Sequence, residues 1–492
     1  MSQTFLIILA ICVFFAVWSF ITWLSSRNAD NSTFFSGKRK MPWPLVAVAM
    51  IGAPITGVTL VSVPGMVVAK QFSYLQMCLG FIVGYLVIAM VLVPIFYRLK
   101  IVSIYGYLEK RFGDSSSKTG AWLFFISKIL GISIRLLIVC AMLQLLIFDA
   151  FDIPFIVCVL SAMTIIWLST FKGGVKSVIY VDVLKSACLL LTIFLCLYYM
   201  IASLDVSPDE LIQNIKEDSS TRIFFLDDPN DGKYFWKQFV AGIFIVIAMT
   251  GLDQDMMQRT LTCKNRSGAK KNLIVSSFLQ VFVISLLLVL GFVMIRYSHL
   301  KGIEIPAKTD NLFPLVAFDK GMPVIIGVLL IIGLISTTFS SVASALTAMT
   351  TTMSLDILKL GRLSDTDFTR KRIITHTLIS VAIIAIVACF FFLNEDDAIS
   401  TVYTLISYTD GPILGLFAFG IFTKRTINER LLPFICLLSP VLAWMIQKAL
   451  FHFLDYQTSF ELLILNALIT ITGLGLCSKA PSVKESAEPI RE

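Results

Sequence analysis

Gly52-Ala53-Pro54-Ile55-Thr56-Gly57 interrupts an apolar stretch that runs from Pro44 to Val68. Because about 20 apolar residues cross a bilayer as a helix, this stretch predicts a membrane span. Proline removes a backbone donor and glycine weakens a helix, so these six residues should open the span near its middle. Carbonyl oxygens freed at membrane depth suit a bare cation or a solute hydroxyl. A packing kink is the alternative interpretation.

The composition of the whole chain also indicates a membrane protein. Of the 492 residues, 57% are hydrophobic and 15% are charged. A soluble fold carries about 25% charged residues, so most of this surface should face lipid rather than water. Nucleic-acid binding, disorder and a disulfide-rich secreted fold are all disfavoured. The ten cysteines include no CxxC pair and the three histidines are far apart, so neither a zinc site nor a histidine metal centre is indicated.

The hydropathy pattern predicts an all-α integral membrane protein with about thirteen transmembrane helices. The expected spans are Thr4–Leu24, Pro44–Val68, Tyr74–Phe96, Gly120–Phe148, Pro154–Leu168, Val178–Ile201, Phe235–Met256, Ile274–Ile295, Val324–Ser354, Ile373–Leu393, Ala398–Phe422, Leu431–Ala449 and Phe460–Cys477.

The basic residues predict how these spans are oriented. Of the 40 Lys and Arg residues, 27 lie in one alternate set of loops and ten in the other. The positive-inside rule therefore predicts an external N-terminus and a cytoplasmic C-terminus in a multi-pass protein of the cell (inner) membrane. The expected loops are too short for a catalytic domain, and no nucleophile and base come together as in an enzyme.

Four hydroxyl side chains mark the expected span Val324–Ser354. Thr337, Ser340, Ser341 and Ser344 have the spacing i, i+3, i+4, i+7 and therefore share one helical face. Hydroxyl and carbonyl oxygens are hard ligands that suit sodium. Alternatively, such residues bond to their own backbone or let helices pack closely.

Charged residues inside other spans are costly and point to function. Asp182 is followed one turn later by Lys185, so its carboxylate could ligate a cation, relay a proton or form an internal salt bridge. Arg135 requires a carboxylate partner, which could be Asp410 or an anionic solute.

A second interruption is expected in Phe235–Met256, where Gly251 precedes Asp253 and Asp255. The two interrupted spans are five spans apart. Interrupted helices at corresponding places of two halves are typical of inverted-repeat transporters.

Several motifs, in order between Met41 and Thr423, resemble the sodium:solute symporter family. They are Met41-Pro42-Trp43 through Val61-Ser62-Val63-Pro64-Gly65, Tyr74-Leu75-Gln76, Phe96-Tyr97-Arg98-Leu99, Ser103 through Gly113, Gly173-Gly174-Val175 with Tyr180-Val181-Asp182, Gln258-Arg259-Thr260-Leu261, the serine-rich ninth span and Gly411 through Phe417. The resemblance implies a LeuT-type core of two inverted five-helix repeats that alternates access under a sodium gradient.

The implied organisation has six parts. They are an N-terminal anchor helix and cytoplasmic loop (1–40), a first repeat (41–203), an external loop (204–233), a second repeat (234–426), two peripheral helices (427–478) and a cytoplasmic tail (479–492). The expected partners are a small solute and the lipid bilayer, with neither a nucleic acid nor an obligate protein partner indicated.

The resemblance also implies where sodium ions bind. The family's main site falls on the carbonyls of Gly52, Ile55 and Thr337 and the hydroxyls of Ser340 and Ser341. A second site, found in some members, falls on Asp182, Ser340 and Ser344. Ala343 lacks a hydroxyl that those members carry, and Lys185 adds a competing charge, so one ion per solute is favoured.

The motifs resemble two branches of the family that differ in solute. Arg135, with Thr56 and Thr59, matches the carboxylate site of the sialic-acid branch. Gln76 and Asp253 are the nearest counterparts of the sugar-binding residues of the other branch. We expect uptake of a carboxylated sugar such as sialic acid, or of another organic anion. A neutral sugar symporter is the alternative, and a membrane sensor or channel is a more distant one.

Overall fold

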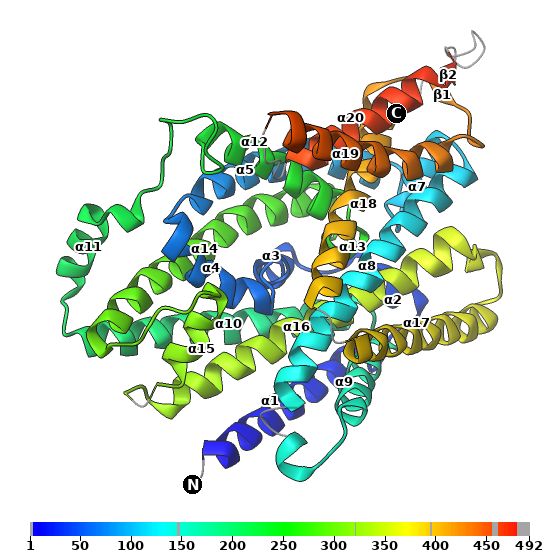
Figure 1. The fold of residues 1–492 in the computed structure, drawn as a ribbon. Coiled ribbons are helices and arrows are strands. Elements are labelled where there is room, and N and C mark those ends of the chain that lie inside the picture. Colours follow the sequence, from blue (N-terminus) through cyan, green and yellow to red (C-terminus); the bar gives the residue numbers. More distant parts are fainter. Residues whose placement is uncertain (1–2, 145–147, 320, 394–395, 455–460, 480–492) are drawn as a thin grey trace.

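The computed structural model describes residues 3–144, 148–319, 321–393, 396–454 and 461–479, which are almost entirely helical (Figure 1). The helices are α1 (Gln3–Ser26), α2 (Asn31–Ser36), α3 (Trp43–Gly52), α4 (Gly57–Lys70), α5 (Tyr74–Val87), α6 (Val93–Arg98), α7 (Tyr105–Arg111), α8 (Asp114–Leu143), α9 (Phe155–Thr170), α10 (Val175–Leu204), α11 (Pro208–Glu217), α12 (Phe235–Val246), α13 (Gln254–Thr260), α14 (Arg266–Lys301), α15 (Leu312–Ala317), α16 (Val324–Thr352), α17 (Asp365–Leu393), α18 (Asp396–Phe422), α19 (Leu432–Leu454) and α20 (Glu461–Leu476). Two short strands, β1 (Thr426–Ile427) and β2 (Ser478–Lys479), pair antiparallel.

Many of these helices are long and apolar enough to span a membrane. Among the described residues, eight pass that test alone, and α12 with α13 passes as a pair bent by 74°. The other expected spans coincide with shorter apolar helices, namely α3 with α4, α9, part of α18 and α20. The multi-pass character is therefore supported, whereas the count of thirteen spans stays a prediction.

Helix α16 forms the centre of the fold (Figure 1). Nearly every side chain from Ile326 to Thr352 is buried, because helices from both halves of the chain surround it. By contrast, α19 buries little of its surface, as expected of a peripheral helix in contact with lipid. The hydroxyl residues of α16 are therefore shielded from lipid in the protein interior, where each needs a partner.

Both predicted interruptions are present. Helix α3 ends at Gly52, and α4 starts at Gly57 after a four-residue break that contains Pro54. The second break follows Gly251, and Asp253 caps the new helix α13 by accepting hydrogen bonds from the backbone nitrogens of Asp255 and Met256 at 2.8 and 3.3 Å. Each break leaves half-helix ends inside the bundle, where their unpaired backbone groups can bind ions.

Helices α5 and α12 approach each other unusually closely through two glycines. A Cβ on Gly80 would lie 2.1 Å from the carbonyl oxygen of Phe239, and a Cβ on Gly242 would lie 2.3 Å from that of Met77. Only glycine fits at either position without a shift of the backbone. This contact joins the second span of the first expected repeat, which contains α5, to the first span of the second expected repeat, which contains α12.

Candidate functional site

The break between α3 and α4 is held against α16. Thr56 caps α4 in a reciprocal arrangement: its hydroxyl accepts from the nitrogen of Thr59, and the Thr59 hydroxyl accepts from the nitrogen of Thr56 at 3.2 Å. A Cβ on Gly57 would lie 3.1 and 3.2 Å from the hydroxyl oxygens of Thr337 and Thr338. Glycine thus allows the opened backbone to lie directly on the hydroxyl face of α16.

The predicted residues of the main sodium site lie on these two facing segments. Ile55 is buried in the break, and the Ser341 hydroxyl donates to the Thr337 carbonyl at 2.7 Å. The Ser340 hydroxyl donates to the Asp182 carboxylate on α10. The available donors are carbonyl and hydroxyl oxygens from an opened helix and a serine face. This donor set fits a small hard cation such as sodium.

Beside the main site, five ionic side chains form a chain across α8, α10 and α13. Arg259 Nε lies 2.9 Å from Asp182 Oδ2, and Arg259 Nη2 lies 3.4 Å from Asp255 Oδ1. Lys128 Nζ lies 3.1 Å from Asp255 Oδ2 and 2.7 Å from Asp253 Oδ2. Asp182 and Arg259 are almost completely buried, so these pairs form at low dielectric, where an unpaired charge is costly.

The predicted second sodium site is only partly assembled. Asp182 and Ser340 are in contact, but the Ser344 hydroxyl donates to Asp255 instead. The other carboxylate oxygen of Asp182 already receives the Arg259 guanidinium. In this structure a fixed cation and a second carboxylate thus engage two of the three residues, and a second sodium at this place stays a prediction.

Lys185 does not pair with Asp182, which was one of the predicted possibilities. No salt bridge joins the two residues in the described part of the chain, where the partner of Asp182 is Arg259. Lys185 is 1% exposed, and its Nζ has no hydrogen-bond partner there. Its Cε and Cδ would lie 3.2 and 3.4 Å from a Cβ on Gly52. The side chain therefore lies against the C-terminal end of α3.

A cavity of about 460 Å³ adjoins the main site and extends to the segment before α16. Arg135 contributes a half-buried guanidinium that makes no ion pair with Asp410 or any other described residue. The lining residues are Thr56, Gly57, Val61, Arg135, Ile138, Val139, Met142, Asp310, Asn311, Pro314, Leu334, Thr338 and Ser341. The cavity thus combines the Arg135 guanidinium, the carboxylate of Asp310, a helix break and one hydroxyl of the predicted sodium site.

Three other predicted solute residues lie outside this lining. Thr59 acts as the capping partner of Thr56. Gln76 is buried, its amide nitrogen donates to the Lys233 carbonyl at 2.8 Å, and its amide oxygen accepts from the Phe225 nitrogen at 3.0 Å. Asp253 is occupied by Lys128 and by the cap of α13. In this structure, Gln76 anchors a loop and Asp253 belongs to the ionic chain.

The sequence interpretation had missed Lys128 and Arg259 as ionic partners. Arg259 follows Asp255 by four residues, a spacing that brings two side chains to one helical face. Lys128 is a lysine within an expected apolar span, which is itself a signal of a buried carboxylate. These two features could have indicated the ionic chain, although not the identity of both partners.

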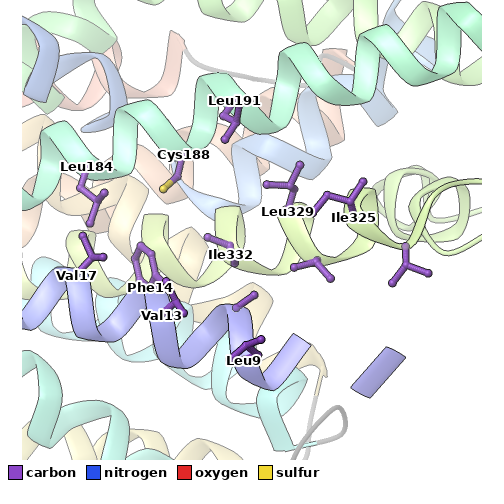
Figure 2. Close-up of a pocket in the computed structure, with 13 residues that line it drawn as sticks. Leu9, Val13, Phe14, Val17, Leu184, Cys188, Leu191, Ile325, Leu329 and Ile332 are labelled. Carbon is purple, nitrogen blue, oxygen red and sulfur yellow. The ribbon is translucent and has the colours of Figure 1, made fainter. Parts of the chain in front are cut away.

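A second cavity, of about 510 Å³, differs sharply in chemistry. It lies between α1, α10 and α16, and Figure 2 shows side chains such as Phe14, Leu184 and Leu329 around it. Every residue that lines it is apolar or Cys188. It therefore has no charged or hydrogen-bonding side chain to hold a polar solute, and the cavity that contains Arg135 is the better candidate.

A profile described as Sodium:solute symporter family matches residues 34–430 of this chain. The chain belongs to the sodium:solute symporter family. Similar relatives include the human sodium/iodide cotransporter (24% identical, covering 85% of this chain and 65% of the relative) and a sodium/sialic acid symporter of Proteus mirabilis (24% identical, covering 82% of each). The human sodium-coupled monocarboxylate transporter 2 is 25% identical and covers 85% of this chain and 67% of the relative.

Solved structures confirm the fold of this symporter family member. The substrate-bound, outward-open structure of a sodium-coupled sialic acid symporter matches with a TM-score of 0.80 at 18% identity, covering 97% of this chain and 99% of that one. A transporter of the nucleobase-cation-symport-1 family matches with a TM-score of 0.57 at 13% identity, covering 90% and 93%. The predicted all-α, LeuT-type membrane fold is therefore confirmed.

Proposed function

We propose that this chain is a sodium-coupled symporter that imports a small solute carrying a carboxylate, such as sialic acid, by alternating access. The observation that carries the proposal is the Arg135 guanidinium, which has no ion pair among the described residues and lines a cavity together with Thr56, Thr338 and Ser341. A guanidinium binds a carboxylate through two parallel hydrogen bonds, and neighbouring hydroxyls can donate to the same group. The predicted orientation, with the N-terminus outside, forms part of this proposal.

The relatives support an anionic solute. Iodide, sialic acid and monocarboxylates are the solutes in the names of three of them, and all three are anions at neutral pH. The neutral-sugar alternative depends on Gln76 and Asp253 as solute ligands. Both side chains are engaged by other protein groups and lie outside the cavity, so the geometry favours the anion.

Ion and solute would share structural elements, which supports coupled transport. The carbonyls of Gly52, Ile55 and Thr337 and the hydroxyls of Ser340 and Ser341 would hold sodium, which supplies a positive charge between α16 and the broken helix. Ser341 belongs both to this set and to the cavity lining. Thr56 caps α4 and lines the same cavity. Each ligand thus favours a conformation in which the other binds better, which is the thermodynamic requirement for coupling.

The test is uptake of labelled N-acetylneuraminate into proteoliposomes with and without an inward sodium gradient. We expect accumulation only with the gradient. Equal uptake without sodium would contradict the coupling. Gradient-driven uptake of neutral sugars, but not of N-acetylneuraminate or monocarboxylates, would contradict the anionic solute while leaving sodium coupling in place.

A further inference from the structure

Lys185 is a buried cation at the centre of the site. Its methylenes lie against Gly52, the last residue of α3 and a predicted ligand of the main sodium site. The C-terminal end of a half-helix carries a partial negative charge from its unpaired carbonyls. Both a sodium ion and the lysine ammonium would be attracted to this end of α3.

Each carboxylate of the ionic chain next to Lys185 already has a basic partner, although its three carboxylates outnumber its two basic side chains by one. Arg259 serves Asp182 and Asp255, and Lys128 serves Asp255 and Asp253. Within the described residues, Lys185 Nζ has neither a carboxylate within salt-bridge distance nor a hydrogen-bond acceptor. Its charge therefore acts on the α3 end and also, without a salt bridge among the described residues, balances the excess carboxylate of the ionic chain.

We propose that Lys185 is a tethered cation that lowers the affinity of the main site for sodium and so sets the sodium concentration at which the carrier works. The inference rests on the main sodium site of the proposed function but does not depend on the identity of the solute. At a dielectric constant of about 20, the repulsion between two unit charges about 10 Å apart still weakens binding by more than tenfold. Removing the ammonium while keeping the length of the side chain should therefore tighten sodium binding.

The experiment measures thermal unfolding of the purified protein without solute, as sodium chloride replaces choline chloride at constant ionic strength. We expect the sodium concentration for half-maximal stabilisation to fall at least about tenfold in Lys185→Met. Lys185→Arg keeps the charge and should remain close to the wild type. Lys448→Met is the matched control because it removes an exposed lysine from the peripheral helix α19. If Lys185→Met does not fold, Lys185→Gln replaces it.

Each outcome decides the proposal. A sodium response in Lys185→Met together with a weaker or absent response in the wild type supports it. Equal half-maximal concentrations in both proteins, or no response in either, overturn it. Adding Ser341→Ala to Lys185→Met should abolish the gained response, and its persistence would place the ion elsewhere. Failure of N-acetylneuraminate uptake would affect only the proposed solute, because no solute enters this experiment.

Discussion

Ser341 and Arg135 come from different helices, α16 and α8, and line the same cavity. One belongs to the predicted ligand set for the ion, and the other carries the free charge proposed for the solute. Their roles can be distinguished because ion binding is measured by the sodium dependence of thermal unfolding, whereas solute binding is measured by the KM for the solute.

Ser341→Ala should weaken sodium binding at least about tenfold, because it removes one of the few oxygen ligands of a small cation. The measurement is the sodium dependence of thermal unfolding without solute. Ser336→Ala is the control, since Ser336 lies on the same helix and, in the described part of the chain, its hydroxyl donates to the carbonyl of Gly333 in its own helix. Undiminished sodium stabilisation in Ser341→Ala would remove this residue from the site.

Arg135→Gln should raise the KM for a carboxylated solute about tenfold to a hundredfold, because a hydrogen bond to a charged group is worth about 1.5–3 kcal/mol. The KM of Arg135→Lys should lie between those of the wild type and Arg135→Gln, since an ammonium keeps the charge but lacks the planar, two-pronged donor geometry of a guanidinium. Sodium-dependent thermal stabilisation should be retained in both variants. An unchanged KM for the anion would give Arg135 a structural role.

At the scale of elements, the sequence predicted the helix breaks well and the contacts poorly. Pro54 and Gly251 disfavour a continuous helix by local chemistry, so both interruptions could be predicted from neighbouring residues. The role of Gln76 could not, because its partners Phe225 and Lys233 lie about 150 residues away in a loop without a distinctive pattern. Local rules identify where a helix opens, but the partner of a buried polar group is decided by tertiary packing.

Gly80→Ala should destabilise the contact between α5 and α12 by about 1–3 kcal/mol, because the added methyl would overlap the Phe239 carbonyl. The measurement is thermal unfolding of the purified protein. Gly475→Ala on α20 is the matched control, since a Cβ there meets nothing within 4 Å. We expect this control to be neutral or slightly stabilising because alanine favours helix. Equal stability of both variants would show that the close approach is not required.

Across the whole molecule, the ionic chain connects helices from both expected repeats. Asp182 on α10 and Lys128 on α8 belong to the first, while Asp253, Asp255 and Arg259 belong to the second. The carboxylates were apparent from the sequence, and Asp253 was assigned to the solute. Its pairing with Lys128 could not be derived, because the two residues are 125 positions apart and several other cations were equally available.

Lys128→Met should destabilise the protein by about 3–5 kcal/mol, because it leaves the largely buried Asp253 carboxylate without a cation and Asp255 with Arg259 alone. Adding Asp253→Asn should restore part of the loss, and the comparison is made by thermal unfolding. The control is Lys118→Met on the same helix, which breaks an exposed pair with Asp114 and should cost less than about 1 kcal/mol. Equal losses in Lys128→Met and Lys118→Met would mean that water compensates the buried carboxylates.

The ionic chain and Lys185 together carry three carboxylates and three basic side chains, and so have no net charge. A membrane potential does work of about 2.3 kcal/mol per unit charge per 100 mV, but it exerts no net force on a neutral group that moves as a unit. Movement of this group would then add no voltage dependence to that of the cargo. One sodium carried with a monoanion is electrically silent, whereas one sodium carried with a neutral sugar produces a current, so an electrode can distinguish the two solute classes before either solute is identified.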